Sequence, residues 1–148
     1  MILDAIDRAI IDELEINGRL SNVALADAVH LTPGPCLRRV QRLEADGVIR
    51  GYRAITDPAA LGRGFEVLLE IGVTRFDKAT IERFESTLAA YDEVVELRRM
   101  FGSPDYFARV AVADQSAYEE FLTEQVMVID GVATISSRFA IKVIKSPQ

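Results

Sequence analysis

The apolar residues of this chain change their spacing part-way along the sequence. Leu3, Ile6, Ile10 and Leu14 follow one another at intervals of three or four residues, which is the period of one face of an α-helix. Between residues 65 and 74 the apolar residues fall on alternate positions instead, as in a strand with one buried face. The change predicts two units of different construction, a helical one followed by one that contains a sheet.

The first unit is predicted to hold three short helices, over residues 3–16, 22–29 and 33–46. Gly18 ends the first helix, Ser21 can cap the second, and Thr32-Pro33 combines a capping residue with proline at the first helical position. Three helices with a tight turn before the third form a helix-turn-helix. We therefore expect a winged-helix-like helix-turn-helix domain over residues 1–50.

A linker is predicted to follow the third helix. Residues 48–56 have the composition of an extended chain, and Asp57-Pro58 then favours a turn. We expect a linker strand and turn over residues 51–62, so that the second domain covers residues 63–148.

The second domain is predicted to have the order strand, helix, strand, strand, helix, strand. The strands are expected over residues 65–74, 94–101, 106–113 and 132–144, and the helices over residues 79–91 and 116–128. This βαββαβ order is that of a ferredoxin-like sandwich, and it makes the whole chain an α+β protein. Since the two helices would cover one face of the sheet, apolar residues on the other face predict self-association.

Composition excludes several classes of protein. With 49% hydrophobic and 27% charged residues, the chain can bury a core and is not a disordered tail. A single cysteine, Cys36, and a single histidine leave no disulfide framework and no zinc knot, so we expect no metal site. No apolar run is long enough to span a bilayer, and the common nucleotide-binding and hydrolytic motifs are missing. These features predict a cytoplasmic protein that has no membrane partner.

The net charge of −6 argues against a protein whose whole surface binds nucleic acid. The charge is unevenly distributed, since residues 1–56 carry 7 basic and 8 acidic residues whereas residues 57–148 carry 10 and 15. Between Ala28 and Arg53, five arginines stand against two acidic residues. We expect the acids of the first unit to lie on its first helix, away from the arginines of the third, which leaves a local basic stripe.

The third predicted helix carries the most informative pattern. If Leu37, Val40 and Leu43 face the core, the outward positions are Gly34, Pro35, Arg38, Arg39, Gln41 and Arg42. Arginine forks match phosphates and guanine edges, and small residues at a helix start allow close approach to the major groove. The alternative is an ordinary solvated helix face with ion pairs. Cys36 is expected to be a small packing residue between the two faces.

Four stretches carry a family resemblance: LDAIDRAIIDEL (residues 3–14), NGRLSNVALADAVHLTPGPCLRRVQRLEADGVIRGYRA (17–54), DPAALG (57–62) and GSPDYFARVAV (102–112). They resemble the leucine-responsive regulatory protein/AsnC family of prokaryotic transcription regulators, also called feast/famine regulators. The resemblance implies a helix-turn-helix that binds double-stranded DNA, dimers that commonly form an octamer, and an amino acid or related metabolite bound between dimers. The DNA contacts that it implies are Thr32, Gly34, Pro35, Arg38, Arg39 and Arg42.

The same resemblance implies an effector site at the hairpin between the second and third strands. Backbone N–H groups around Gly102 can bind a carboxylate, and Asp105 can receive an ammonium group, which together describe an α-amino acid. Ser103 and Pro104 depart from the acidic or asparagine residue that the family more often has after the glycine. The expected effector site comprises Gly102, Asp105, Tyr106, Thr134, Ser136 and Ser137. The alternative is a plain turn, in which Asp105 bonds the neighbouring backbone and Tyr106 packs.

Our leading hypothesis is a sequence-specific transcription regulator, not an enzyme, that has no cofactor and whose DNA binding or assembly responds to an amino acid effector. A dimer would place two recognition helices in successive major grooves, about 34 Å apart, so the operator should be near-palindromic. One alternative is a ligand-independent architectural DNA-binding protein of the same fold. Another is a small catalytic domain that uses Asp105 or Tyr106, which is weaker because no paired carboxylates, metal cluster or nucleophile with a base can be named.

Overall fold

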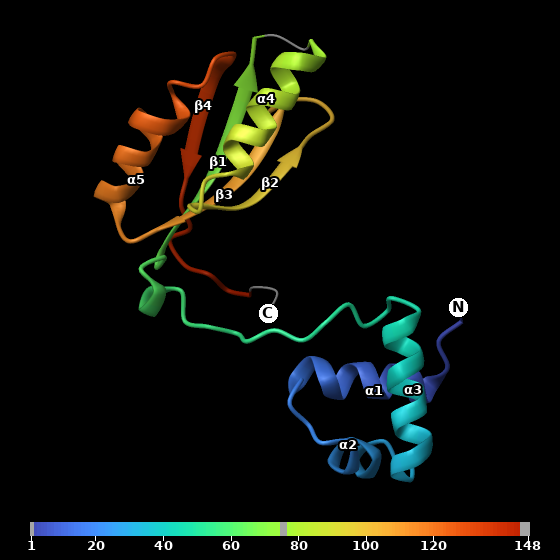
Figure 1. Ribbon diagram of the computed structural model, residues 1–148. Coiled ribbons are helices and arrows are strands. Elements are labelled where there is room, and N and C mark those ends of the chain that lie inside the picture. The colour runs from blue at the N-terminus through green and yellow to red at the C-terminus, as the bar shows by residue number, and fades with distance from the viewer. Residues whose placement is uncertain (1, 75–76, 146–148) are drawn as a thin grey trace. The chain divides into compact units, whose positions relative to one another are not determined.

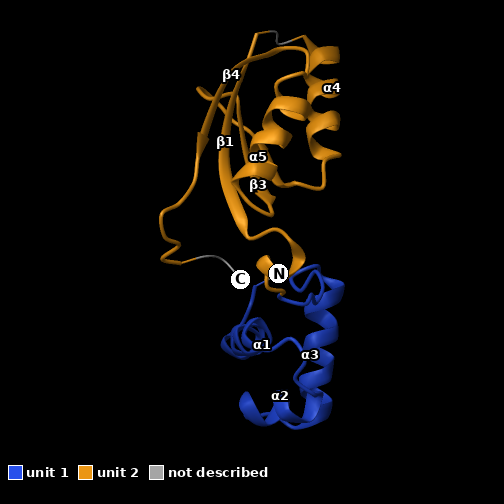
Figure 2. Ribbon diagram, turned by 90° about the vertical axis from the view of Figure 1, so that its left-hand side faces the viewer, with its two compact units in different colours: residues 1–55 blue, residues 56–148 orange. Residues whose placement is uncertain are grey.

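The computed structural model of the chain describes residues 2–74 and 77–145. It divides into two compact units, residues 1–55 and residues 56–148 (Figure 2). The last three residues of the expected second domain, 146–148, lie outside the described residues.

The first unit contains three helices, α1 (Ala5–Ile16), α2 (Asn22–Ala28) and α3 (Pro33–Ala45) (Figure 1). A capping box starts α1: the Asp4 carboxylate accepts the Asp7 N–H at 2.8 Å, and the Asp7 carboxylate accepts the Asp4 N–H at 3.2 Å. Ser21 caps α2 through the Ala24 N–H, and Pro33 is the first residue of α3. The predicted helix-turn-helix arrangement is confirmed.

The core of the first unit draws on all three helices and contains Ile10, Leu25, Ala26, Val29, Cys36 and Leu43. Cys36 is fully buried, as expected for a small packing residue. Leu37 is 44% exposed, so the prediction that it faces inward is wrong. Spacing alone permits a buried stripe through either position, and packing against α1 and α2 selects Cys36.

The turn before α3 is closed by a Schellman motif. The His30 N–H donates to the Asp27 carbonyl at 3.2 Å, and the Leu31 N–H donates to the Ala26 carbonyl at 2.8 Å. His30 occupies the position where glycine is usual, with a left-handed φ of 56°. This backbone conformation ends α2 and lets α3 start three residues later, at Pro33.

The chain after α3 differs from the prediction. Among the described residues no strand forms between Ala45 and Phe65, and the segment holds only a short 3-10 turn, η1 (Ala59–Leu61). The predicted linker strand is therefore wrong, because a strand needs a neighbour with which to exchange backbone hydrogen bonds. Tyr52 instead lies against Gly18, and its hydroxyl group donates to Glu44 Oε1 at 2.9 Å.

The second unit has the order β1 (Phe65–Val73), α4 (Lys78–Ala89), β2 (Val94–Arg99), β3 (Tyr106–Val112), α5 (Gln115–Phe121) and β4 (Val132–Arg138). A π-helical stretch, η2 (Leu122–Val126), continues α5. The four strands form an antiparallel sheet in the order β2-β3-β1-β4, and both helices cover the same face (Figure 2). This confirms the predicted α+β class and the ferredoxin-like βαββαβ order.

The helix-covered face of the sheet forms the core of the second unit. Alternate residues of β1 and β3 are buried there against Phe84 and Leu88 of α4 and Phe121 of α5.

No helix in the described part of the chain is long and apolar enough to cross a membrane.

The last strand is shorter than predicted. Its pairing with β1 ends where Arg138 lies opposite Leu68, whereas the strand was expected to reach residue 144. The exposed side chains of Phe139, Ile141 and Val143 continue the apolar alternation beyond that point. An alternating pattern predicts an extended chain, but it contains no information about where the neighbouring strand stops.

The uncovered face of the sheet is more polar than predicted. Arg109 of β3 lies 3.2 Å from Glu66 and 3.4 Å from Glu96, and Arg138 of β4 lies 3.3 Å from Glu70. Half-buried Leu68 and Phe107 share this face. The face therefore combines an ion-pair lattice with a small apolar centre.

Candidate DNA-binding surface and effector site

Helix α3 presents a polar stripe on the side opposite its buried residues. At about 100° per residue, Gly34, Arg38 and Gln41 fall on one line, opposite Cys36 and Leu43. The three are exposed, whereas Cys36 and Leu43 are fully buried. Neither Arg38 nor Gln41 has a hydrogen-bonding or ionic partner among the described residues. Both side chains are therefore available to a partner molecule.

The other two arginines of α3 are engaged with α1. Arg42 Nη2 donates to both carboxylate oxygens of Asp7 at 2.7 Å. Arg39 Nη1 donates to Asp7 Oδ1 at 2.8 Å and to Asp4 Oδ2 at 2.7 Å. The prediction that the acids of the first helix lie away from the arginines of the third is wrong, because the start of α1 packs against the side of α3.

These ion pairs shift the pKa values of Asp4 and Arg39. The pKa of the Asp4 carboxyl group is lowered, chiefly by the hydrogen bond from the Asp7 N–H and then by Arg39. The pKa of Arg39 is raised by its hydrogen bonds to the carboxylates of Asp4, the larger effect, and of Asp7. Asp7 itself has a side chain that is only 1% exposed. Its carboxylate is thus a buried charge that two guanidinium groups neutralise.

The start of α3 contains the remaining predicted DNA contacts. Thr32 and Gly34 are exposed and Pro35 is half-buried. The Thr32 side chain makes no capping hydrogen bond, so its hydroxyl group is not used by the helix. Asn22, which the sequence did not single out, donates from Nδ2 to the Pro33 carbonyl at 2.8 Å and joins α2 to the start of α3.

The hairpin between β2 and β3 contains part of the predicted effector site. Gly102 is exposed and has a φ of 108°, a conformation that side chains rarely allow. Asp105 Oδ2 accepts the N–H of Val73, at the end of β1, at 2.8 Å. A Cβ atom at Gly72 would lie 2.3 Å from Thr134 Oγ1 and 3.7 Å from Asp105 Oδ2, so Asp105 and Thr134 converge on the same point of the sheet.

The other predicted effector residues do not all join this group. Tyr106 is 1% exposed, and its ring centroid lies 4.7 Å from that of Phe84 with the two rings tilted by 49°. Its hydroxyl group donates to Glu85 Oε1 at 2.9 Å. The hydroxyl groups of Ser137 and Tyr118 lie 2.5 Å apart. Tyr106 and Ser137 therefore face the helix layer. The structure therefore places these two side chains on the other face of the sheet from Asp105 and Thr134.

Strand alternation explains the division. Tyr106 shares its face with the buried Ala108, and Ser137 lies directly opposite the buried Leu69 of β1. Ser136 lies opposite Glu70, on the uncovered face. Burial raises the pKa values of both the Tyr106 and the Tyr118 hydroxyl groups, as expected for side chains of the core layer.

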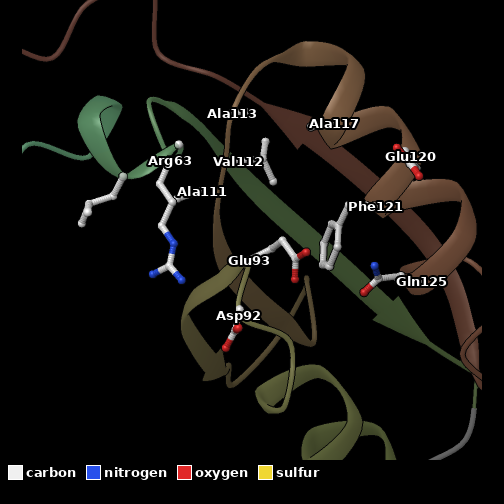
Figure 3. Close-up of a pocket in the computed structure, with 12 residues that line it drawn as sticks. Arg63, Asp92, Glu93, Ala111, Val112, Ala113, Ala117, Glu120, Phe121 and Gln125 are labelled. Carbon is white, nitrogen blue, oxygen red and sulfur yellow. The ribbon is translucent and has the colours of Figure 1, made fainter.

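A separate pocket of about 370 Å³ lies at the other end of β3 from the hairpin (Figure 3). Val112 and Phe121 form part of its apolar wall, and Arg63, Glu93 and Gln125 contribute polar groups. These side chains come from distant parts of the sequence, so no sequence motif predicted the pocket. None of the six predicted effector residues lines it. The described residues also contain no cluster of His, Cys, Asp and Glu suited to a metal ion.

Comparison with known proteins supports both units. Residues 3–50 match the family model described as winged helix-turn-helix DNA-binding, and residues 66–148 match the Lrp/AsnC ligand binding domain. The chain is 40% identical over 130 residues to the leucine-responsive regulatory proteins of Haemophilus influenzae and Escherichia coli strain K12. These alignments cover 88% of this chain and 78% and 79% of the two relatives.

Solved structures agree. A transcriptional regulator from Neisseria meningitidis in complex with L-Met superposes with a TM-score of 0.92 at 32% identity, over 99% of this chain and 94% of that one. An AsnC family transcriptional regulator from Agrobacterium tumefaciens gives a TM-score of 0.91 at 35% identity, over 98% and 94% of the two chains.

A helix-turn-helix unit followed by a ligand-binding unit of this kind defines a class of DNA-binding transcription regulators. The chain belongs to the Lrp/AsnC family of these regulators. The predicted resemblance is confirmed. Because the family consists of regulators and not of enzymes, the catalytic alternative built on Asp105 or Tyr106 is set aside.

Proposed function

We propose that the protein is a sequence-specific regulator in which α3 enters the major groove and an amino acid bound by the second unit changes DNA binding or assembly. The observation that carries the proposal is the exposed stripe of α3, on which Arg38 and Gln41 have no partner in the described chain. Arginine and glutamine are side chains that read guanine and adenine edges.

The start of α3 supports the same orientation. Thr32 and Gly34 are exposed, and Pro35 is half-buried, so the first turn of the helix presents little bulk. A dimer would place two such helices in successive major grooves, about 34 Å apart, and we propose a near-palindromic operator. Arg39 and Arg42 flank this stripe on the side of α1. We propose a cytoplasmic location, as expected from the sequence, because a transcription regulator must reach the DNA that it binds.

The effector that we propose is an α-amino acid held at the hairpin. Gly102 offers backbone N–H groups to the carboxylate, and Asp105 offers a carboxylate to the ammonium group. One oxygen of Asp105 accepts from Val73, and the other has no partner in the described chain. Thr134 and Ser136 add hydroxyl groups on the uncovered face. The Neisseria meningitidis neighbour, solved as an L-Met complex, supports an amino acid as the class of effector.

We also propose that the uncovered sheet face joins two copies into a dimer and that dimers assemble further, up to an octamer. Half-buried Leu68 and Phe107 provide an apolar centre for such a contact, surrounded by ion pairs. Effector binding near the edge of this face would change assembly, and coupling of this kind typically changes DNA affinity by about 1 to 3 kcal/mol.

The effector proposal is tested by a thermal-shift screen of the full chain against the twenty amino acids. Asp105→Asn keeps an oxygen for the Val73 N–H but removes the charge that would face an ammonium group. The matched control is Asp92→Asn, at the pocket on the other end of β3. A shift lost only in Asp105→Asn supports the hairpin site, and a shift lost only in Asp92→Asn contradicts it. If no amino acid shifts the transition, the ligand-independent architectural alternative is favoured.

The DNA proposal is tested by selecting duplexes from a randomised library with the full chain. A regulator should prefer the selected duplex over random DNA by roughly 10³-fold or more. Comparable affinity for both would support architectural binding instead.

A further inference from the structure

We infer that the three arginines of α3 have two different roles, and this inference rests on the proposed binding of DNA by that helix. Arg39 and Arg42 are positioning residues that hold α3 on α1 through Asp7. Arg38 is the arginine that reads base edges, with Gln41 beside it. The sequence alone presents the three arginines as one basic group, whereas the structure separates them.

The first argument is the saturation of the Asp7 carboxylate. Both of its oxygens accept hydrogen bonds from Arg42, and Oδ1 also accepts one from Arg39. Its side chain is 1% exposed, so water cannot replace these donors without opening the contact between α1 and α3. If Arg42 turned toward DNA, both oxygens of a buried carboxylate would lose a donor, which is strongly unfavourable. If Arg39 turned toward DNA, it would give up its ion pairs with both Asp4 and Asp7.

The second argument is the geometry of base recognition. Bidentate contact with guanine uses two N–H groups of one guanidinium fork at the same time. Arg39 Nη1 is already shared between Asp4 and Asp7. Its side chain is also only 27% exposed, so most of it is covered by the first unit. With Nη1 engaged and the side chain held against α1, Arg39 cannot turn its Nη1–Nη2 fork toward a base without breaking these ion pairs.

The third argument is that Arg38 meets both requirements. It lies on the exposed stripe with Gly34 and Gln41, and no acid or backbone carbonyl of the described chain occupies its guanidinium group. Gly34, one helical turn earlier, adds no side chain that would hold the helix away from the groove. Leu37, 44% exposed on the flank of the stripe, can contact a thymine methyl group.

The arrangement has a consequence for the role of Asp7. An acid next to a DNA-binding helix would normally repel phosphates, but here its charge is neutralised by two cations. Asp7 is therefore a positioning residue that fixes the orientation at which α3 presents Arg38.

The test compares base preference, which a positioning residue does not set. The full chain first selects duplexes from a randomised library, and the variants Arg38→Ala, Arg42→Ala, Arg42→Lys and Asp7→Asn are then selected in the same way. We expect Arg38→Ala to bind the wild-type duplex about 5- to 150-fold more weakly and to lose its preference at one base-pair position of each half-site.

The positioning variants should behave differently. Arg42→Ala and Asp7→Asn should bind more weakly but select the same base pairs as the wild type, and combining them should weaken binding little more than either alone. Arg42→Lys should recover part of the loss, since an ammonium group restores one ion pair, and it also supplies a folded variant if Arg42→Ala does not fold. The salt dependence of binding should be unchanged in Arg42→Lys, because no phosphate contact is removed.

A base preference altered in Arg42→Lys, or additive losses in the double variant, would overturn the division of roles while leaving the proposed function in place. A wild-type protein that selects no common sequence would instead overturn the proposed function. Helix content and thermal transitions of every variant, measured by circular dichroism, establish that folded proteins are compared.

Discussion

Replacing Asp7 by asparagine should destabilise the first unit far more than any other change of a single acidic residue on α1. The substitution keeps the size of the side chain but removes the charge that faces Arg39 and Arg42. It also turns one carboxylate oxygen into an amide NH₂ group, which points a donor at the donors of the guanidinium groups. The Asp7 side chain is 1% exposed, so solvent cannot compensate from its side.

The size of the effect follows from the exposure of the partners. Removing one partner of a fully buried ion pair costs about 3–5 kcal/mol. The side chains of Arg39 and Arg42 are 27% and 48% exposed, so both can turn into water and recover part of that loss. We expect a loss of about 2–3 kcal/mol, at or below the lower limit for a fully buried pair. For a unit of this size such a loss lowers the unfolding temperature by roughly 10–20 °C.

The assay is thermal unfolding of the full chain by circular dichroism, combined with amide hydrogen exchange in α1 and α3 to assign the transition to the first unit. Asp12→Asn is the matched control, since Asp12 is exposed on the same helix and has no partner in the described chain. It should change stability by no more than about 0.5 kcal/mol. An Asp7→Asn transition as close to the wild type as that of Asp12→Asn would refute the reasoning.

Three further predictions concern other parts of the chain. His30→Gly should stabilise the first unit by about 0.5 kcal/mol in urea titrations, since release of the left-handed strain exceeds the added entropy of the unfolded glycine; a less stable variant would contradict the Schellman assignment. Because the pKa of Asp4 is lowered in the folded chain, the stability it contributes is present above about pH 4 and is lost as the pH falls through the folded pKa, so Asp4→Asn should flatten the acid limb of the stability curve. An unchanged limb would count against this role. Gly72→Ala should destabilise the second unit by about 1 kcal/mol through contact with Thr134, and Thr134→Ala should relieve that loss in a double-mutant cycle; strict additivity would show that the two positions do not touch.

Most of the fold was predicted from the spacing of apolar residues along the sequence. The start of α3 at Pro33 and the alternation of β1 are local signals, and both were confirmed because helix starts and strand alternation depend on residues close in sequence. The Thr32 side chain occupies the N-cap position without making the capping hydrogen bond. The ends of elements were less accurate. Beyond Arg138 the alternation continues, but the pairing with β1 stops, and pairing is a property of another segment.

The candidate sites show the same limit in more detail. The exposed stripe of α3 could be located from helical spacing, except that the choice between Cys36 and Leu37 required the packing of α1 and α2. The alternation of β3 and β4 would have predicted that Tyr106 and Ser137 face the helix layer, since both fall on the same face as buried residues of the sheet. The family resemblance grouped Asp105 with Thr134, but local spacing could not predict that they converge beside Gly72, because this brings together a hairpin loop and two strands.

The sequence by itself determined that this chain has a helix-turn-helix followed by a βαββαβ unit, and that the basic residues of the first unit concentrate in and just after the third helix. Those properties follow from short-range spacing, capping and composition. Only the tertiary structure decided which arginines remain available, since Asp7 and Arg39 are 32 residues apart in sequence and meet only when α1 packs against α3. The sequence shows how many arginines α3 contains, whereas the fold decides which of them form ion pairs with an acid of α1.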